Sequence, residues 1–165
     1  MMHGHKIIAL FATLYLAITV LPAYARAPVS PERIQFIHMG GDDCPPCKAW
    51  RLSELPKLKE TSVFPNVTFS YVRKLIQSPV PASFFLPDEV KPLKEKLDYA
   101  SGGRSGSPQQ VIIVDGEVFD YWFGARNANQ IEQALVSLVE GTNYPYRRCV
   151  KWTAEGNRSC EIKMP

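Results

Sequence analysis

The chain has 165 residues, of which 45% are hydrophobic and 21% are charged, and its formal net charge is +3. This length suffices for one domain with a proper hydrophobic core. The nearly balanced charge argues against a nucleic-acid partner and against a strongly charged one, and the sequence contains no repeats or low-complexity segments.

Residues 1–25 have the layout of a secretory signal peptide. Lys6 precedes an uncharged apolar run from Ile7 to Val20, and Ala23-Tyr24-Ala25 matches an A-x-A cleavage pattern. We expect cleavage after Ala25, which makes the protein periplasmic or secreted. The alternative is an uncleaved anchor, but the run is short of the roughly 20 apolar residues that span a membrane. No later stretch is long enough, so we expect no stable membrane span after cleavage.

The mature chain begins with a predicted buried strand over residues 33–39, a loop over 40–43 and a helix over 46–58. Between loop and helix lies Cys44-Pro45-Pro46-Cys47. A cysteine at a helix N-terminus is favoured as a thiolate by the unpaired N–H groups and the dipole there, and proline is tolerated in the first turn. The apolar face expected for this helix is formed by Ala49, Leu52, Leu55 and Leu58. Pro56 is expected to kink or end it.

The pattern continues with a strand over 67–72, a Pro- and Ser-rich loop over 76–87, a helix over 88–97 and a flexible connection over 101–106. Val111–Val114 is a continuous β-branched run, and Asp115-Gly116 predicts a hairpin turn into a strand over 118–123. Asn127 is a predicted N-cap with Gln130 three residues on. The helix that follows has an apolar face formed by Ile131, Ala134, Leu135 and Leu138.

All four cysteines lie after the predicted signal peptide. An even number in an exported chain favours disulfides over zinc. Cys149 and Cys160 enclose ten residues in a basic tail, and we interpret them as a structural staple worth about 2–3 kcal/mol. The alternative is one zinc site built from both pairs, for which the second spacing is long.

The order of these elements resembles the thioredoxin-like superfamily over residues 33–140. Cys44-Pro45-Pro46-Cys47 matches its redox motif, Ser107-Pro108 resembles its cis-proline, and Phe123-Gly124 resembles its closing glycine before the last helix. The resemblance implies an α/β fold with a central mixed sheet flanked by helices. To this the chain adds a helical insert and a disulfide-stapled C-terminal tail, residues 141–165. The signal peptide and the domain over 26–140 complete the expected organisation.

The resemblance also implies a thiol–disulfide oxidoreductase that acts on exported protein thiols with an unidentified redox partner, without cofactor or metal. We expect Cys44 to be the nucleophile, because it lies at the helix N-terminus and can be exposed there, and Cys47 to be the resolving thiol. Asp42 and Asp43 oppose a thiolate by their charge, while Lys48 and the helix dipole favour one. Prolines rather than a histidine between the cysteines favour a reductase or isomerase over an oxidase.

The supporting residues each keep two interpretations. His38 stands where cytoplasmic thioredoxins carry a buried acid, and it is either a hydrogen-bonded strand residue or a proton carrier for Cys47. Ser107 either offers backbone groups to a substrate or is a plain turn residue. Trp50, Tyr121, Trp122 and Phe123 either rim a groove or belong to the core.

Two other function classes remain open. One is a non-enzymatic binding module on the same scaffold, with both cysteine pairs as structural disulfides. The other is metal handling by Cys44 and Cys47, with or without His38. The ease of reduction of the pair separates a catalytic disulfide from a structural one.

Overall fold

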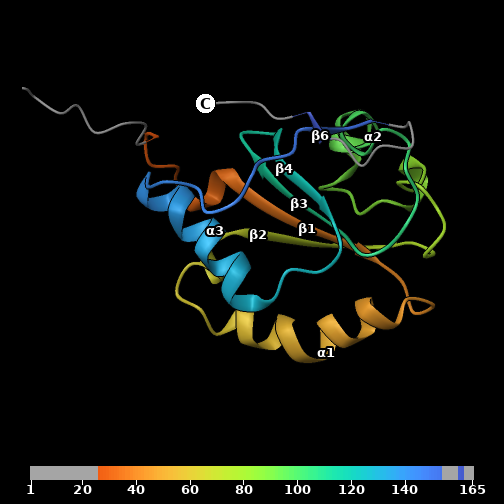
Figure 1. Cartoon of the computed structure of the whole chain (residues 1–165), viewed down its shortest axis with the longest axis horizontal. Helices are drawn as coiled ribbons and strands as arrows, with labels where there is room; N and C mark the ends of the chain where they lie inside the picture. Colours follow the sequence, from red (N-terminus) through yellow and green to blue (C-terminus); the bar gives the residue numbers. More distant parts are fainter. Residues whose placement is uncertain (1–25, 154–159, 162–165) are drawn as a thin grey trace, which may run out of the picture.

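The computed structural model describes residues 26–153 and 160–161 (Figure 1). The predicted signal peptide and its cleavage site lie outside these residues. In chain order the structure has β1 Ile34–Gly40, α1 Pro45–Lys59, β2 Thr68–Arg73, α2 Lys94–Ser101, β3 Gln109–Val114, β4 Glu117–Phe123, α3 Ala128–Glu140, β5 Lys151–Trp152 and β6 Cys160–Glu161. Short 3₁₀-helices occupy Pro31–Arg33, Phe64–Asn66, Ser83–Phe85 and Lys91–Leu93.

Four strands form one mixed sheet in the order β2-β1-β3-β4. β1 pairs in parallel with β2 and antiparallel with β3, and β3 pairs antiparallel with β4. A parallel pair needs a crossover, which α1 supplies, whereas β3 and β4 need only the turn at Asp115-Gly116. The fold is thioredoxin-like, with a helical insert before β3, which confirms the predicted fold class.

The sheet is covered on both faces, so it carries two hydrophobic clusters. α1 and α3 pack on one face (Figure 1), where Phe36, Trp50, Ile112 and Leu135 belong to one cluster. On the other face, residues of α2 and of the insert, including Leu97, pack against β1, β3 and β4. None of the helices in the described part of the chain is long and apolar enough to cross a membrane.

Helix α1 differs from its expected form in two respects. Pro56 lies inside it and does not end it, because the helix continues to Lys59. The predicted apolar face is correct at Leu58, which is buried, but not at Leu52, which is 79% exposed; Cys47 and Trp50 are buried as well. Pro56 lacks an N–H, so the carbonyl of Leu52, four residues before it, has no partner within the helix. Leu52 is exposed, so water can bond to this carbonyl.

The insert between β2 and β3 departs from the predicted helix over 88–97. A turn closes at Val90, whose N–H donates to the carbonyl of Pro87, and the 3₁₀-helix Lys91–Leu93 follows. Pro92 lies in that 3₁₀-helix, and α2 begins only at Lys94. The α-helix therefore starts where the chain has passed its last proline before Pro108, so no proline N–H is missing from its hydrogen bonds.

Strand β4 contains a bulge that sequence alternation did not indicate. Ile112 pairs with Asp120 and Ile113 pairs with Val118, so Phe119 is the extra residue. A bulge changes which side chains share a face. Phe119 consequently joins the same cluster as Trp122, while Tyr121 packs on the opposite face.

The C-terminal tail is bonded along β4 rather than hanging from the domain. The backbone N–H of Tyr121 donates to the carbonyl of Cys149 at 2.8 Å, and the indole N–H of Trp152 donates to the carbonyl of Tyr121 at 2.9 Å. β4 is an edge strand of the main sheet, so the tail occupies polar groups that would otherwise be open.

Candidate functional site

A disulfide between Cys44 and Cys47 lies at the N-terminus of α1, directly after β1. Cys44 is the N-cap of the helix, and its sulfur accepts a hydrogen bond from the backbone N–H of Cys47 at 3.2 Å. Pro45 and Pro46 occupy the first two helical positions, where no intrahelical N–H bond is lost. The sequence thus places the sulfur of Cys44 where helix N–H groups and the helix dipole stabilise negative charge.

Both sulfurs are shielded from solvent, which differs from the exposed Cys44 expected from sequence. Cys44 and Cys47 are each 0% exposed. Gly40, the last residue of β1, allows the chain to pass close to the bridge. A Cβ atom there would stand 2.6 Å from the Cys47 sulfur, so any side chain at this position would collide with it.

The two acidic residues before Cys44, Asp42 and Asp43, both have hydrogen-bond partners that reduce the effect of their negative charge on a thiolate. Asp42 pairs with Arg51 and with Arg73, and these hydrogen bonds lower the pKa of its carboxyl. Asp43 accepts the backbone N–H of Ile76 at 2.9 Å. Asp42 therefore lies in a mixed-charge group with two guanidinium ions rather than acting as an isolated negative charge.

His38 is fully buried in the middle of β1. Its ring stacks on Trp50 with ring centroids 4.1 Å apart, and the ring of Tyr71 lies on it at 5.7 Å. Nδ1 is 2.9 Å from the side-chain nitrogen of Gln110, whereas Nε2 has no hydrogen-bond partner within residues 26–153 and 160–161. Burial, assisted by the positive charge of Arg51, lowers the pKa of His38 to about 3, so the ring is neutral.

The position of His38 relative to the bridge follows from Gly40. The point where a Cβ of Gly40 would stand is 2.6 Å from the sulfur of Cys47 and 3.3 Å from Nε2 of His38. The unpartnered nitrogen of His38 and the sulfur of Cys47 thus share the neighbourhood of one glycine. The structure brings together the two residues that the sequence connected only by resemblance.

The Ser107–Pro108 segment lies in the loop before β3. The peptide bond is cis, Pro108 is buried, and its carbonyl accepts the backbone N–H of Gly124 at 2.9 Å. The hydroxyl of Ser107 accepts a hydrogen bond from Nζ of Lys74 at 2.9 Å. The Ser107 side chain is therefore engaged within the protein.

Lys74 is a buried lysine that sequence reasoning missed. Its Nζ also donates to the carbonyl of Gly106 at 2.6 Å, and burial lowers its pKa to about 8 against the opposing charge of Asp43. Lys74 thus ties the end of β2 to the loop that carries Pro108. Nothing in its local pattern marks it, because a lysine after a strand is most often solvated.

An open pocket of about 300 Å³ borders the loop that leads into Cys44. It is lined by Gly41, Asp42, Asp43, Arg73, Lys74 and Leu75. Leu75 is 67% exposed at its edge. Of the aromatic residues considered for a groove, Trp50, Tyr121 and Trp122 are buried and Phe123 is half-buried, so they pack in the interior instead.

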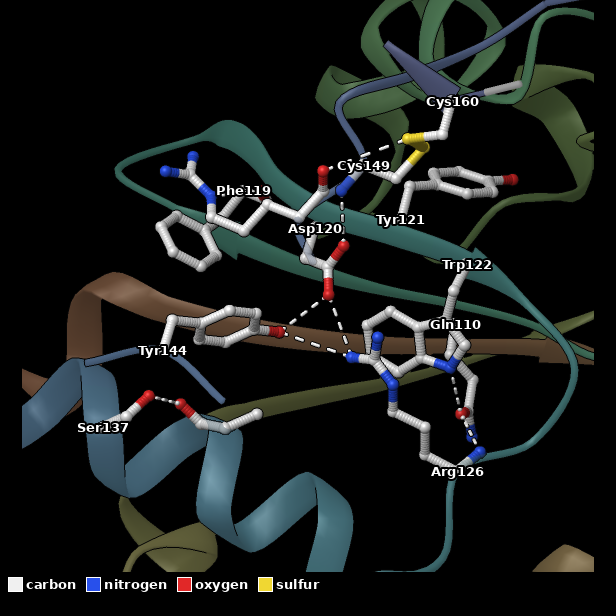
Figure 2. Close-up of polar contacts among 12 residues, drawn as sticks. Gln110, Phe119, Asp120, Tyr121, Trp122, Arg126, Ser137, Tyr144, Cys149 and Cys160 are labelled. Atoms are coloured by element: carbon white, nitrogen blue, oxygen red, sulfur yellow. Dashed lines mark hydrogen bonds and ion pairs between the residues drawn. A yellow bond between two sulfur atoms is a disulfide. The ribbon is translucent and has the colours of Figure 1, made fainter. Parts of the chain in front are cut away.

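Cys149 and Cys160 form the second disulfide, as expected for a tail staple. Figure 2 shows that the carboxylate of Asp120 is hydrogen-bonded to Cys149, Arg126 and Tyr144. One oxygen accepts the backbone N–H of Cys149 at 2.8 Å, and the other accepts from Arg126 at 2.9 Å and from the hydroxyl of Tyr144 at 2.7 Å. Asp120 is 0% exposed, so these donors replace the water that its charge has lost.

Among residues 26–153 and 160–161, no three His, Cys, Asp or Glu side chains gather as a metal site would require. Cys44 and Cys47 are bonded to each other. The arrangement can break and re-form one disulfide at a helix N-terminus, next to a buried neutral imidazole.

No protein-family model matches the chain, and no curated protein matches its sequence. Among solved structures it is similar to a thioredoxin from Fasciola hepatica, with 18% identity, 66% of this chain and 84% of that chain covered, and a TM-score of 0.40. It is also similar to mitochondrial thioredoxin 3 from Saccharomyces cerevisiae, with 23% identity, 66% of this chain and 82% of that chain covered, and a TM-score of 0.41. A third similar structure is a thioredoxin-family thiol:disulfide interchange protein from Chlorobium tepidum, with 15% identity, 66% of this chain and 81% of that chain covered, and a TM-score of 0.46. The strand order and connections of the chain itself define its fold.

Proposed function

We propose that the protein is a thiol–disulfide oxidoreductase that exchanges disulfides with exported proteins through Cys44 and Cys47. The observation that carries the proposal is the placement of this bridge at the N-terminus of α1, where the Cys44 sulfur already accepts a helix N–H. Such a site lowers the pKa of a thiol and favours the thiolate, which is the form that attacks disulfides.

In the reduced protein the Cys44 thiolate attacks one sulfur of a substrate disulfide. A bond forms between Cys44 and that sulfur, the substrate disulfide breaks, and the second substrate sulfur leaves as a thiolate that takes a proton from water. The Cys47 thiolate then attacks the Cys44 sulfur, which restores the Cys44–Cys47 bridge and releases the reduced substrate. The protein has lost two electrons and the substrate has gained them. The oxidised protein runs the same steps in reverse.

The proposal places the protein in the periplasm or outside the cell, after removal of residues 1–25. The layout of Lys6, the apolar run after it and Ala23-Tyr24-Ala25 supports export. The substrates are then exported proteins with accessible disulfides or thiols, and a separate redox partner resets the bridge. Mass spectrometry of the protein from its native compartment tests the cleavage point, because a mature N-terminus other than Arg26 contradicts it.

Trapping tests the exchange chemistry directly. Cys47→Ala leaves Cys44 able to attack a disulfide but leaves no thiol to resolve the adduct, so mixed disulfides with exported proteins should accumulate and disappear on reduction. Cys44→Ala is the matched control and should trap far less. Equal trapping by both variants would mean that the roles of the two cysteines are wrong.

A second candidate is a binding module in which Cys44–Cys47 is a structural disulfide. The full burial of both sulfurs favours it, because exchange requires a substrate sulfur to reach Cys44 in line with the bridge. Titration of the bridge against glutathione buffers separates the two functions. A bridge that equilibrates with glutathione is catalytic, and one that resists reduction in the folded protein is structural.

The direction of electron flow is part of the same measurement. Pro45 and Pro46 between the cysteines, with no histidine there, are the basis for favouring reduction or isomerisation over oxidation. A reduction potential close to that of a cellular reductant fits this expectation. A strongly oxidising potential would contradict it.

A further inference from the structure

His38 belongs to a row of four side chains that crosses the sheet at one level. It pairs with Tyr71 in β2 and with Gln110 in β3, and Gln110 in turn pairs with Trp122 in β4. Directly opposite residues of neighbouring strands point to the same face of a sheet. The row therefore lies beneath α1, which carries both the bridge and Trp50.

Gln110 is held in one orientation by two groups that can only donate. Its side-chain oxygen accepts the indole N–H of Trp122 at 2.9 Å and the backbone N–H of Arg126 at 2.9 Å (Figure 2). The oxygen must accept both bonds, so the amide nitrogen is the atom that lies 2.9 Å from Nδ1 of His38. That nitrogen has only hydrogens to offer.

It follows that Nδ1 of His38 accepts a hydrogen bond and carries no proton. A neutral imidazole holds one proton, which is then on Nε2. Nε2–H is thus a buried donor without a partner among the residues that the structure describes, and it shares the neighbourhood of Gly40 with the Cys47 sulfur. Such a donor costs free energy unless an acceptor reaches it, and a sulfur in a disulfide is a poor acceptor.

We propose that His38 is a neutral hydrogen-bond donor to the Cys47 thiolate, positioned by Gln110, and that it does not act as the base that removes the Cys47 proton. The inference rests on the proposed function for its role in turnover. When the bridge opens by attack on the Cys44 sulfur, the Cys47 sulfur leaves as a thiolate, which accepts strong hydrogen bonds. The unpaired donor of the oxidised protein then gains its acceptor.

The charges around the ring agree with a donor that stays neutral. Arg51 of α1 is the charged group that acts on the ring, and a nearby positive charge disfavours imidazolium. Trp50, Tyr71 and Gln110 contact the ring without charge, and the hydroxyl of Tyr71 donates to the carbonyl of Gly40 at 2.7 Å. Arg51 also favours a thiolate in the same region.

In the resolving step, the Cys47 thiol gives its proton to water and its thiolate attacks the Cys44 sulfur of the mixed disulfide. The Cys44–substrate bond breaks with its electron pair on the substrate sulfur, which takes a proton from water. His38 keeps its own proton throughout. Its contribution is to increase the fraction of Cys47 present as thiolate, and the reverse reaction uses the same bond to stabilise Cys47 as it leaves.

The test measures the pKa of the Cys47 thiol from the ultraviolet absorbance of its thiolate as pH is raised. All the proteins compared carry Cys44→Ser, so that Cys47 is the free thiol that titrates. His38→Phe keeps a flat ring for Trp50 and Tyr71 but removes the donor, and we expect it to raise the pKa of Cys47 by at least about one unit, a tenfold loss of thiolate below that pKa. His38→Gln keeps an N–H and cannot serve as a base at these pH values. We expect it to leave the pKa within about half a unit of that with His38.

Nitrogen NMR of His38 in the otherwise unmodified protein is the second measurement, and it does not depend on the folding of a variant. We expect a proton on Nε2 and none on Nδ1 in both redox states. A protonated Nδ1, a His38 that titrates near neutral pH, or a Cys47 pKa that does not change in the phenylalanine variant would overturn the proposal. So would a glutamine variant that behaves like the phenylalanine variant. None of these readouts uses a substrate, so failure of the exchange function would appear separately, in trapping.

Discussion

The Cys44–Cys47 bridge and the Cys149–Cys160 bridge differ in how the polar groups around them are satisfied. Cys44, Cys47 and Cys149 are all buried, so burial of sulfur does not separate the two bridges. Beside Cys149, both oxygens of Asp120 accept hydrogen bonds, and the backbone N–H and carbonyl of Cys149 are both bonded to β4. Near Gly40 and Cys47, the Nε2 atom of His38 has no hydrogen-bond partner in the described part of the chain.

This difference indicates which of the two disulfides is suited to open and close. A site whose neighbouring polar groups are all paired with one another offers no waiting donor to the sulfur when the disulfide opens. A site with an unpaired buried donor near the sulfur gains a hydrogen bond when a thiolate forms. The tail bridge therefore has the surroundings of a permanent staple, and the bridge at α1 has those of a redox pair.

The largest expected effect is on disulfide exchange. Cys44→Ser removes the proposed nucleophile, and the rate of reduction of a protein disulfide should fall to that of the uncatalysed reaction. Cys149→Ala combined with Cys160→Ala should retain most of the exchange rate at a temperature where the variant is folded. Loss of exchange in the folded tail variant would break the comparison, because it would make the tail pair a second redox relay.

Asp120 tests how strongly the tail region is held. Asp120→Ala should lower the free energy of unfolding by about 3–5 kcal/mol, because it leaves the guanidinium of Arg126 buried without its partner. Denaturation in urea measures the change. Asp88→Ala is the matched control, since the exposed pair of Asp88 with Lys91 is worth at most about 1 kcal/mol. Similar losses for both aspartates would mean that the Asp120 network is not a structural anchor.

Removal of each bridge should cost a different amount of stability. Loop-closure entropy predicts a loss of about 3 kcal/mol for the Cys149–Cys160 loop and about 2 kcal/mol for the shorter Cys44–Cys47 loop. Alanine replacement of both cysteines in each pair, followed by urea denaturation, measures the two losses. A larger loss at Cys44–Cys47 than at the tail would reverse the assignment of staple and redox pair.

Acid should destabilise the region around His38 specifically. The pKa of His38 is about 3 in the folded protein against 6.5 for a free side chain, so below pH 6.5 the unfolded chain binds a proton that the folded one does not. The free energy of unfolding should therefore fall as pH falls from 6.5 toward 3, by about 1 kcal/mol over the first unit and by close to 1.4 kcal/mol over the next. His38→Gln should remove this component from urea denaturation curves measured across that range. An unchanged pH dependence in the variant would show that His38 is not held neutral by folding.

The sequence by itself determined the features that depend on neighbours in the chain. Asn127 and Gln130 form the predicted capping box, Asp115-Gly116 forms the predicted turn, and the cysteine spacing put Cys44 at a helix N-terminus. These are local, because a cap, a two-residue turn and a helix start each need only a few adjacent residues. They were enough to order the elements, and that order carried the resemblance from which the fold class was expected.

Only the tertiary structure decided what surrounds the two bridges. The row of Tyr71, His38, Gln110 and Trp122 exists because four strands pair in one register, and no spacing within a strand reveals its partners. The bulge at Phe119 likewise sets which residues of β4 share a face. The buried face of α1 was predicted correctly at Leu58 but not at Leu52 for the same reason, since hydrophobicity favoured Leu52 while packing against the sheet selected Trp50. Pairing and packing between distant segments are long-range choices, and they fixed the proton of His38 and the anchoring of the tail.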